Sequence, residues 1–351
     1  MEKEIFINQL IKWYHHNGRD LPWRSTSDPY YIWLSEIILQ QTRIAQGLPY
    51  YQKFVAAYPT IFDLAAAEEQ EVLRLWQGLG YYSRARNLHT CAKQVVNDYK
   101  GEFPNTYTEL LKLKGVGKYT ASAIASFAFG ENKAVVDGNV YRVLSRVFGI
   151  EDDIAEAKTY KVFETLADGL VKGNNAADFN QGIMDFGAIQ CTPKSPSCGI
   201  CPFSSSCFAY NEGRQHQLPL KSKKVKVRER HFSYLIFEFE GHILLKERGP
   251  KDVWQGLHDF PLVESKQAEN EEEVLDQVGS SGLIHLETSF IYTHILTHQR
   301  IFARFYRFKV KDSANFVKLQ KAYDALPNSV EQIHELPKPI LIENYWKENI
   351  L

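Results

Sequence analysis

The chain has 351 residues, enough for two domains that each bury a hydrophobic core. Its composition, 44% hydrophobic and 24% charged, is that of a globular protein, and no apolar run approaches the roughly 20 residues of a membrane-spanning helix. A net charge of −1 neither favours nor excludes nucleic acid as a partner. Because the acidic first residues lack the basic and apolar regions of a signal peptide, we expect an intracellular, reducing compartment.

An amphipathic helix is predicted over residues 4–17, followed by a loop interrupted by proline. The helix residues expected to face a core are Ile5, Leu10, Ile11 and Trp13. The loop, RDLPWR at 19–24, precedes Asp28-Pro29, a pair typical of a helix start.

The next helix carries one charged residue, Glu36, in an otherwise apolar stretch that includes Trp33, Leu34 and Ile37. Two interpretations stay open for this carboxyl. It is exposed on one face, or it points into a pocket where desolvation raises its pKa. The polar residues after this helix, QQT at 40–42, suit base edges or phosphates.

A glycine-rich turn, QGLGYYSRAR at 77–86, follows helices predicted at 50–58 and 68–75. Two aromatic and two basic side chains at a turn suit insertion between bases and phosphate binding. The alternative is a packed tyrosine beside a solvated arginine face.

Residues 110–146 contain the pattern helix, Gly115-Val116-Gly117, helix, with the second helix predicted from Tyr119 to about Phe129. The pattern is that of a helix-hairpin-helix, whose open amides and helix N-terminus suit a DNA phosphate. Taken alone it also fits an ordinary turn between helices. Twenty residues after Gly117, the carboxylate Asp137 ends an apolar run.

Four cysteines, spaced C-x6-C-x2-C-x5-C, form the most specific signal; they are Cys191, Cys198, Cys201 and Cys207. Thiols this close together in a reducing compartment are metal or cluster ligands rather than disulfides. Zinc remains possible, although spacing favours a [4Fe–4S] cluster. The fifth, Cys91, is predicted to be a buried apolar residue.

The composition changes after the cysteines. Residues 215–230 lack apolar periodicity and are predicted to be a linker. Seven Lys/Arg between Arg214 and Arg230 form a basic strip that suits a phosphate backbone or simply a solvated linker. Beyond it, strands at 232–240 and 242–247 and a helix at 271–278 predict an α+β domain, with no strand expected before residue 225.

In this order the motifs resemble those of the MutY-type adenine DNA glycosylase family, within the helix-hairpin-helix superfamily. The resemblance covers nearly the whole chain. It rests on RDLPWR at 19–24, SE at 35–36 with QQT at 40–42, GLGYY at 78–82, GVGKYT at 115–120, VDGNV at 136–140 and the cysteine loop.

The resemblance implies an all-α helix-hairpin-helix glycosylase domain (1–214) with a [4Fe–4S] loop, a basic linker (215–230) and a smaller α+β MutT/Nudix-like domain (231–351). The last resembles that domain in WQGL at 254–257 and FP at 260–261, but it lacks the paired-Glu signature that binds metal. We therefore expect it to recognise a lesion rather than to hydrolyse nucleotides.

The implied activity is removal of adenine opposite 8-oxoguanine or G from duplex DNA, after the base flips out of the helix. N-glycosidic hydrolysis needs one protonated and one ionised carboxyl beside an oxocarbenium-like sugar. By resemblance Glu36 is the acid and Asp137 the anion, supported by Tyr119 and Asn139.

Further roles also come from the resemblance. Leu21, Trp23, Arg24 and Gln181 match positions around the extruded adenine. Gln41 and Tyr81 match the lesion strand, and Thr297 and His298, in LTH at 296–298, match a Phe-Ser-His lesion loop. Gly115, Val116 and Gly117 match the DNA-backbone turn. We expect a monomer in a bacterial cytoplasm, associated with the nucleoid through DNA.

Two rivals remain. An endonuclease III-like glycosylase/lyase needs a Schiff-base lysine where this chain has Tyr119, and Lys118, one residue earlier, points about 100° away on a helix. A non-catalytic DNA-binding or electron-transfer protein explains the cysteines but gives no reason for Glu36 and Asp137.

Overall fold

The computed structural model describes residues 1–222 and 226–349. By contacts between residues, the chain divides into two units. The first comprises Met1–Ala66 and Asn87–Lys223, and the second comprises Ala67–Arg86 and Lys224–Leu351. A short internal segment, 67–86, therefore groups with the C-terminal residues rather than with its neighbours in sequence.

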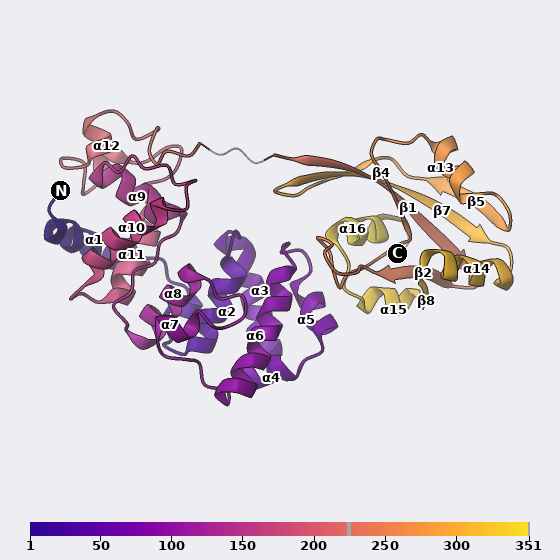
Figure 1. Cartoon of the computed structure of the whole chain (residues 1–351), viewed down its shortest axis with the longest axis horizontal. Helices are drawn as coiled ribbons and strands as arrows, with labels where there is room; N and C mark the ends of the chain where they lie inside the picture. The colour runs from indigo at the N-terminus through magenta and orange to yellow at the C-terminus, as the bar shows by residue number, and fades with distance from the viewer. Residues whose placement is uncertain (223–225, 350–351) are drawn as a thin grey trace. The chain divides into compact units, whose positions relative to one another are not determined.

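The first unit is helical (Figure 1). Its α-helices are α1 (Lys3–Asn17), α2 (Pro29–Leu39), α3 (Ile44–Ala57), α4 (Ile61–Ala66), α7 (Tyr107–Leu110), α8 (Lys118–Phe129), α9 (Gly138–Phe148), α10 (Thr159–Val171), α11 (Ala176–Ile189) and α12 (Phe208–Asn211). Two 3₁₀-helices lie at Pro22–Arg24 and Cys198–Ile200. Helix α5 (Glu69–Trp76) lies in the second unit, and α6 (Ser83–Tyr99) crosses the division.

A core of aromatic and aliphatic side chains holds α1, α9, α10 and α11 together. Phe6 and Leu10 of α1 are fully buried in it, and Phe6 stacks on Phe203 from the cysteine loop. The prediction that Ile5 faces the core is wrong, because its side chain is 46% exposed. Phe6 and Leu10 are four residues apart on one face, and Ile5 lies about 100° around the helix from Phe6.

The hairpin turn forms between a short helix and a long one. Helix α7 ends at Leu110, four residues before the turn, and Leu111 is exposed. Gly115 has φ +76°, and a Cβ added there would lie 2.8 Å from Cβ of Asn87. The turn therefore needs glycine at 115 both for its conformation and for its packing.

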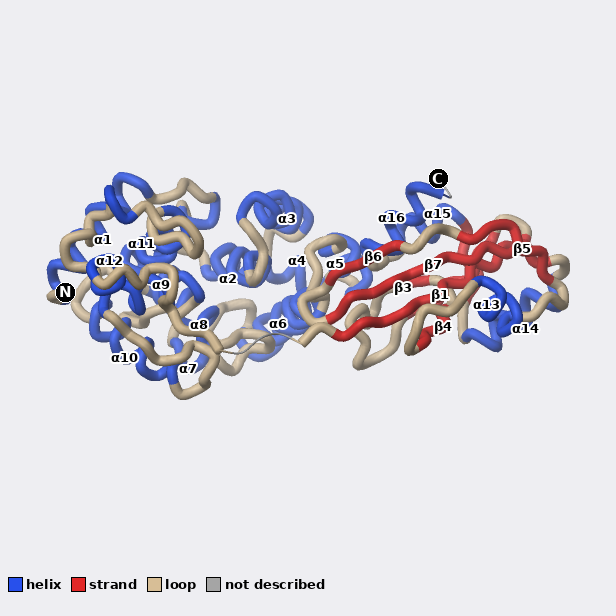
Figure 2. The backbone as a smooth tube through the Cα atoms, turned by 90° about the horizontal axis from the view of Figure 1, so that it is seen from above, coloured by secondary structure: helices blue, strands red, loops and turns tan. Residues whose placement is uncertain are grey.

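The second unit is built on a mixed sheet of eight strands with the central order β3-β2-β1-β7-β5 (Figure 2). Among the described residues, the first strand of the chain begins at Arg228, after residue 225 as expected but four residues before the predicted start at 232. The strands are β1 (Arg228–Phe239), β2 (His242–Glu247), β3 (His258–Asp259), β4 (Leu262–Ser265), β5 (Leu283–Thr288), β6 (Tyr292–Ile295), β7 (Gln299–Val310) and β8 (Leu326–Ser329). Long strands β1 and β7 run parallel, in register from Arg228 opposite Gln299.

Helices cover both faces of this sheet. On one face, Leu235 and Phe237 pack with side chains of α13 (Glu271–Val278) and α14 (Ser313–Tyr323). On the other, Phe305 stacks on Tyr345 of α16 (Ile340–Asn349), with ring centroids 3.9 Å apart. Alternation of side chains along β1 and β7 supplies both cores. A short helix, α15 (Val330–Glu335), precedes α16.

The linker prediction is wrong at its C-terminal end, because Arg228 to Arg230 belong to β1. Three arginines of the basic strip are also paired with acids: Arg214 with Glu151, and Arg228 and Arg230 with Glu264. Lys223 and Lys224 of the strip lie outside the described residues. Within the described ranges, no helix is both long and apolar enough to cross a membrane.

The hairpin geometry predicts that Gly115→Ala destabilises the protein by about 1–3 kcal/mol, because alanine is strained at positive φ and its Cβ meets Asn87. Urea unfolding followed by far-ultraviolet circular dichroism measures the loss. Gly117→Ala is the control, since Gly117 has a negative φ and no atom within 4 Å of an added Cβ. An equal effect of both variants would contradict the argument.

Candidate active site

Glu36 points into a cavity of the first unit, which answers the question that the sequence leaves open. Its side chain is 8% exposed on α2, a helix that begins where Asp28 accepts a hydrogen bond from the Tyr30 N–H at 2.8 Å. The cavity, about 570 Å³ in volume, is lined by Glu36, Leu39, Gln40, Gln41, Gly115, Gly117, Lys118, Tyr119, Thr120, Asp137 and Gly138. Carboxyl, hairpin turn and Asp137 thus share one cavity.

Burial raises the pKa of Glu36 to about 7. That value is the net result of several effects. The charge of Asp137 adds to the rise in the pKa, whereas a hydrogen bond from Tyr119 and the charge of Arg24 oppose it. Loss of water dominates because the charged form of the carboxyl suffers most from desolvation. Glu36 is therefore half protonated near neutral pH, the state that a general acid requires.

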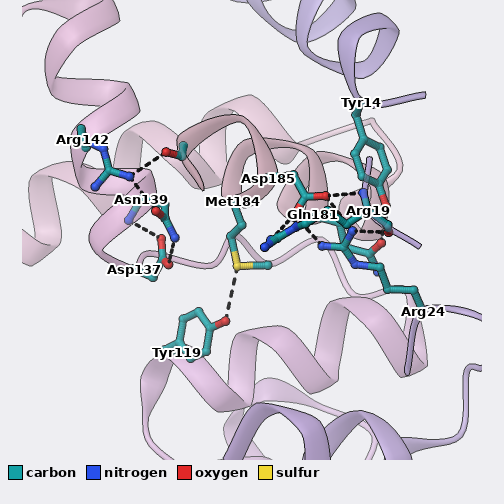
Figure 3. A network of polar contacts seen from close by, with 11 residues as sticks. Tyr14, Arg19, Arg24, Tyr119, Asp137, Asn139, Arg142, Gln181, Met184 and Asp185 are labelled. Carbon is teal, nitrogen blue, oxygen red and sulfur yellow. Dashed lines mark hydrogen bonds and ion pairs between the residues drawn. The ribbon is translucent and has the colours of Figure 1, made fainter. Parts of the chain in front are cut away.

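Asp137 is the N-cap of α9, and its carboxylate is held by three donors, of which Figure 3 shows the contacts of Asn139. Oδ1 accepts from the backbone N–H groups of Asn139 and Val140, each at 2.8 Å, and Oδ2 accepts from Nδ2 of Asn139 at 2.8 Å. Burial raises the pKa of Asp137, and these hydrogen bonds oppose that rise. The donors stabilise an anion that points into the cavity from the positive end of a helix.

Arg142 orients the amide of Asn139. Its Nη2 donates to Oδ1 of Asn139 at 2.7 Å and to the Gly187 carbonyl at 2.8 Å, while its Nε donates to the Cys191 carbonyl at 2.8 Å (Figure 3). The amide Nδ2 therefore has to face Asp137. The sequence analysis missed Arg142, although an arginine one helical turn after the cap was a usable signal.

Tyr119, the second residue of α8, places its hydroxyl 3.3 Å from Sδ of Met184 and hydrogen-bonds Glu36. Burial raises its pKa well above the usual value, so the phenol keeps its proton. Lys118 lines the same cavity, but its ammonium lies 4.4 Å from the ring centroid of Tyr160. A phenol, not an amine, therefore faces the acid.

Arg24 lies in a buried ionic cluster centred on Asp185, a residue that the sequence analysis missed. Asp185 is fully buried and accepts two hydrogen bonds from Arg24, at 2.7 and 2.9 Å, and three from Arg19. The pKa of Asp185 is lowered: burial opposes the fall, but hydrogen bonds from Arg24 and Arg19 outweigh it. An acid among the apolar residues of the C-terminal half of α11 was the available signal.

The other residues predicted around the adenine also pack within the protein. Leu21 and Trp23 are each 7% exposed, and Trp23 meets Tyr51 edge to face. Gln181 accepts a hydrogen bond from the Tyr14 hydroxyl at 2.5 Å. These three residues and Arg24 do not line the cavity that contains Glu36, within the part of the chain that the structure describes.

The hairpin turn opens onto the cavity. Gly115, Gly117 and Gln41 line it, whereas Val116 is buried. Gly117 is the N-cap of α8 and, having no side chain, leaves the first amides of the helix without a side-chain partner. Such an N-terminus attracts an anion.

The four clustered cysteines surround one small cavity beside α9 and α11, and none forms a disulfide. Arg146 links them: its Nη1 donates to Sγ of Cys191 at 3.4 Å, and its carbonyl accepts from Sγ of Cys207 at 3.3 Å. Phe203 N–H donates to Sγ of Cys201 at 3.4 Å. Such N–H···S bonds suit thiolates that hold an iron–sulfur cluster. Within the described ranges, no three His, Cys, Asp or Glu residues are grouped to hold a single metal ion.

Two residues predicted at the lesion strand meet in the second unit. The hydroxyls of Tyr81 and Thr297 are hydrogen-bonded although 216 residues separate them in sequence. Tyr81 is 42% exposed and sits at φ +49° in a turn where Gly78 and Gly80 also have positive φ. Thr297 and exposed His298 lie in the tight connection between β6 and β7, where the Leu296 N–H donates to the Gln299 carbonyl at 2.8 Å.

Comparisons with known proteins agree with this geometry. The HhH-GPD superfamily base excision DNA repair protein family matches residues 34–168, the iron-sulfur binding domain of endonuclease III matches 191–207, and the NUDIX domain matches 233–348. The adenine DNA glycosylase of Buchnera aphidicola subsp. Schizaphis graminum is 36% identical over 263 residues, 75% of this chain and 76% of its own. The chain belongs to the adenine DNA glycosylase family. The human adenine DNA glycosylase is 40% identical over 80% of this chain and 54% of its own.

Solved structures extend the likeness for the helical part. A thermostable thymine-DNA glycosylase is 36% identical with a TM-score of 0.56, covering 60% of this chain and 97% of that one. A trapped endonuclease III–DNA covalent intermediate, 23% identical with a TM-score of 0.53, covers 61% of this chain and 99% of that one, and shows the shared fold.

Three predictions made from the sequence are thereby confirmed. The chain is a glycosylase that acts on adenine in DNA during base excision repair. It carries a [4Fe–4S] cluster, which decides against zinc. Its fold is a helix-hairpin-helix domain with a cluster loop, followed by a Nudix-like domain.

The raised pKa of Glu36 predicts that the protein loses stability as pH rises. The folded state holds a proton that the unfolded state has released between the ordinary pKa of 4.5 and about 7. The free energy of unfolding therefore falls over that interval, by on the order of 3 kcal/mol at 1.36 kcal/mol per unit, and then levels off. Glu36→Gln, which cannot ionise, is expected to be more stable than the wild type at pH 8 by up to this amount.

Urea unfolding of both proteins at pH 5 and pH 8 measures this difference. Glu164→Gln is the matched control: Glu164 is 6% exposed in the same unit, but its pKa is lowered, since the hydrogen bonds of Lys133 and Lys161 outweigh burial. That variant should lose stability at pH 8. An equal change in the two variants would show that the carboxyl of Glu36 is not desolvated.

Proposed function

We propose that the chain is a monofunctional glycosylase that removes adenine paired with 8-oxoguanine or G by hydrolysing its N-glycosidic bond. The observation that carries the proposal is the pair of carboxyls in one cavity, Glu36 with a pKa of about 7 and Asp137 held by three donors. Such a pair supplies the proton and the negative charge that glycosidic cleavage needs. The cavity, about 570 Å³ in volume, has room for a flipped nucleoside, which supports base flipping.

In this mechanism Glu36 gives its proton to N7 of adenine, which makes the base a neutral leaving group. The sugar develops positive charge, which the carboxylate of Asp137 stabilises. Asn139 keeps that carboxylate oriented, and Tyr119 holds Glu36 through its hydroxyl. Water then completes the hydrolysis and leaves an abasic site.

The role of Arg24 is indirect. Its guanidinium, held by Asp185, lowers the pKa of Glu36 through its charge. We propose that Leu21, Trp23 and Gln181 support the wall around the adenine from the same packed layer. The reaction stops at base release because the position facing the acid is Tyr119, and a phenol forms no Schiff base.

DNA contacts are proposed at three places. Gly115, Val116 and Gly117 bind a backbone phosphate at the N-terminus of α8. Gln41 contacts the lesion strand, and Tyr81 wedges between its bases. Thr297 and His298 contact 8-oxoguanine.

The four cysteines, 191, 198, 201 and 207, are the proposed cluster ligands, and the cluster supplies a fixed loop rather than a chemical step. We propose that the protein acts as a monomer.

A single-turnover assay on duplexes with A opposite 8-oxoguanine, A opposite G, T opposite G and an oxidised pyrimidine tests the activity. We expect strand breaks only at adenine and only after alkali. The thymine duplex is included because the thymine-DNA glycosylase is 36% identical over 60% of this chain. Cleavage without alkali, or loss of thymine or pyrimidine alone, would sink the proposal.

The general-acid role predicts that Glu36→Gln lowers the single-turnover rate by about 10²–10⁴-fold while the lesion duplex still binds. Glutamine keeps the shape and the contact with Tyr119 but has no proton to give. The wild-type rate should also fall as pH rises above about 7, where Glu36 ionises. A variant that keeps its rate would remove Glu36 from this role.

Lesion recognition predicts that Thr297→Ala lowers the preference for A opposite 8-oxoguanine over A opposite G by about tenfold, the effect of one lost hydrogen bond to a buried partner. Thr293→Ala, on exposed β6 of the same hairpin, is the control. The ratio of the two single-turnover rates is the readout. An unchanged ratio in Thr297→Ala would place lesion recognition elsewhere.

A further inference from the structure

The turn at 77–82 is attached at its first residue, Gln77, to the C-terminal part of the second unit. Its amide oxygen accepts the backbone N–H of Lys338 at 2.9 Å, and its side chain hydrogen-bonds the carboxylate of Glu343. A single amide thus contacts both the loop before α16 and the first turn of α16. Gln77 is also the C-cap of α5, directly before Gly78.

The partners of Gln77 are themselves a rigid support. Lys338 is fully buried, and its ammonium donates to the carbonyls of Ile333 and Leu336, the latter at 2.8 Å. It lies 3.5 Å from Glu343, which is 4% exposed. Buried charges that lose a partner are costly, so this group holds one arrangement.

From Gln77 the chain passes through a turn that has little freedom of its own. Trp76 Nε1 donates to the Gly80 carbonyl at 3.0 Å, and the Gly78 N–H donates to the Tyr82 hydroxyl at 3.2 Å. Leu79 is buried. A turn braced in this way moves as one piece, so the position of Tyr81 depends on where Gln77 is held.

Tyr81 and Thr297 are placed against each other by this attachment. Thr297 belongs to the β6–β7 connection, and its hydroxyl meets that of Tyr81. A second contact, from Arg86 Nη1 to the Gln255 carbonyl at 2.6 Å, lies beyond the turn and does not fix its near end. Gln77 is the contact at the residue where the turn begins.

We infer that Gln77 is a positioning residue that sets Tyr81 against Thr297, and thereby determines how well the enzyme distinguishes the base opposite adenine. The inference rests on the proposed wedge role of Tyr81 and lesion role of Thr297. The proposed role of Gln77 needs no contact with DNA or with the reacting atoms. It acts through the turn that follows it.

The test uses the full-length holoenzyme with Gln77→Leu, whose side chain is one bond shorter but of similar volume, and which removes both hydrogen bonds. We expect the preference for A opposite 8-oxoguanine over G to fall about tenfold. The single-turnover rate on A opposite G should stay the same, because the carboxyl pair is untouched. Fluorescence of 2-aminopurine beside 8-oxoguanine should change less on binding, because the wedge enters less often.

Gln70→Leu is the matched control. Gln70 lies on α5 and donates to the Gly256 carbonyl at 3.4 Å, a weaker contact two helical turns before the glycine-rich turn. The Gln70→Leu variant should keep the wild-type preference for A opposite 8-oxoguanine and the wild-type fluorescence response. An equal loss of preference in both variants would mean that the general packing of α5, and not Gln77, is responsible.

A charge exchange tests the direct partner. Gln77→Glu places a carboxylate beside Glu343 and should lower the preference at least as much as leucine does. Adding Glu343→Gln places an amide donor opposite the new carboxylate at position 77. The hydrogen bond then forms in the opposite direction, and the preference should recover. A double variant that stays as poor as Gln77→Glu would overturn the inference.

The outcomes also separate this inference from the proposed function. A wild-type enzyme without any preference for 8-oxoguanine would refute the proposed lesion recognition itself. A wild-type preference that survives in Gln77→Leu would refute only the positioning role. Loss of rate on both duplexes, with earlier urea unfolding, would show a purely structural role and would also refute it.

Discussion

The carboxylate of Asp137 is the constraint on which the first unit depends. The hydrogen bonds that begin α9 are the same bonds that hold this anion in the cavity. Along the same helix, Arg142 and Arg146 reach the carbonyl and the sulfur of Cys191. A single helix therefore connects the proposed catalytic anion at its start to the cluster loop one and two turns later. In the proposed arrangement, the cluster supports the site by holding the loop to which these two arginines bind.

Glu36 and Asp185 show two solutions to the same physical problem, a carboxyl buried in an apolar helix. Asp185 receives five hydrogen bonds from two arginines and stays ionised with a lowered pKa. Glu36 has only Tyr119 and a more distant arginine, and its pKa rises to about 7. The first arrangement stabilises the fold. The raised pKa of Glu36 lowers the stability of the folded protein at neutral pH, and in the proposed mechanism it provides a transferable proton. Such a trade is expected where activity and stability compete.

In the proposed function, the division into two units separates chemistry from recognition. The cavity with both carboxyls lies within the first unit, whereas Tyr81 and Thr297 meet within the second. Segment 67–86 joins the second unit because Gln77, Arg86 and Gln70 bond to it. Tyr81 and the β6–β7 hairpin, far apart in the chain, thus meet within one unit. Point substitutions therefore test their roles more directly than deletion of the C-terminal domain.

The sequence by itself determined what depends on local pattern and residue chemistry. Gly115 and Gly117 predicted the hairpin, the spacing of four cysteines predicted a cluster loop, and helix 271–278 was placed at its observed bounds. It also singled out Glu36 and Asp137, because a lone acid in an apolar helix and an acid after an apolar run are both unusual. Local errors, such as Ile5 and the end of the linker, arose where helix phase or strand pairing decided the outcome.

Only the tertiary structure decided which residues meet across long distances. Asp185 binds Arg24 across 161 residues, Arg142 reaches Gly187 and Cys191, and Gln77 accepts the N–H of Lys338 across 261 residues. The pairing of these residues has no local signature, even where one partner stands out by itself, because a hydrogen bond depends on position in space and not on separation in the chain. The pKa of Glu36 likewise depends on the tertiary structure, because it rises when neighbouring elements exclude water from the carboxyl.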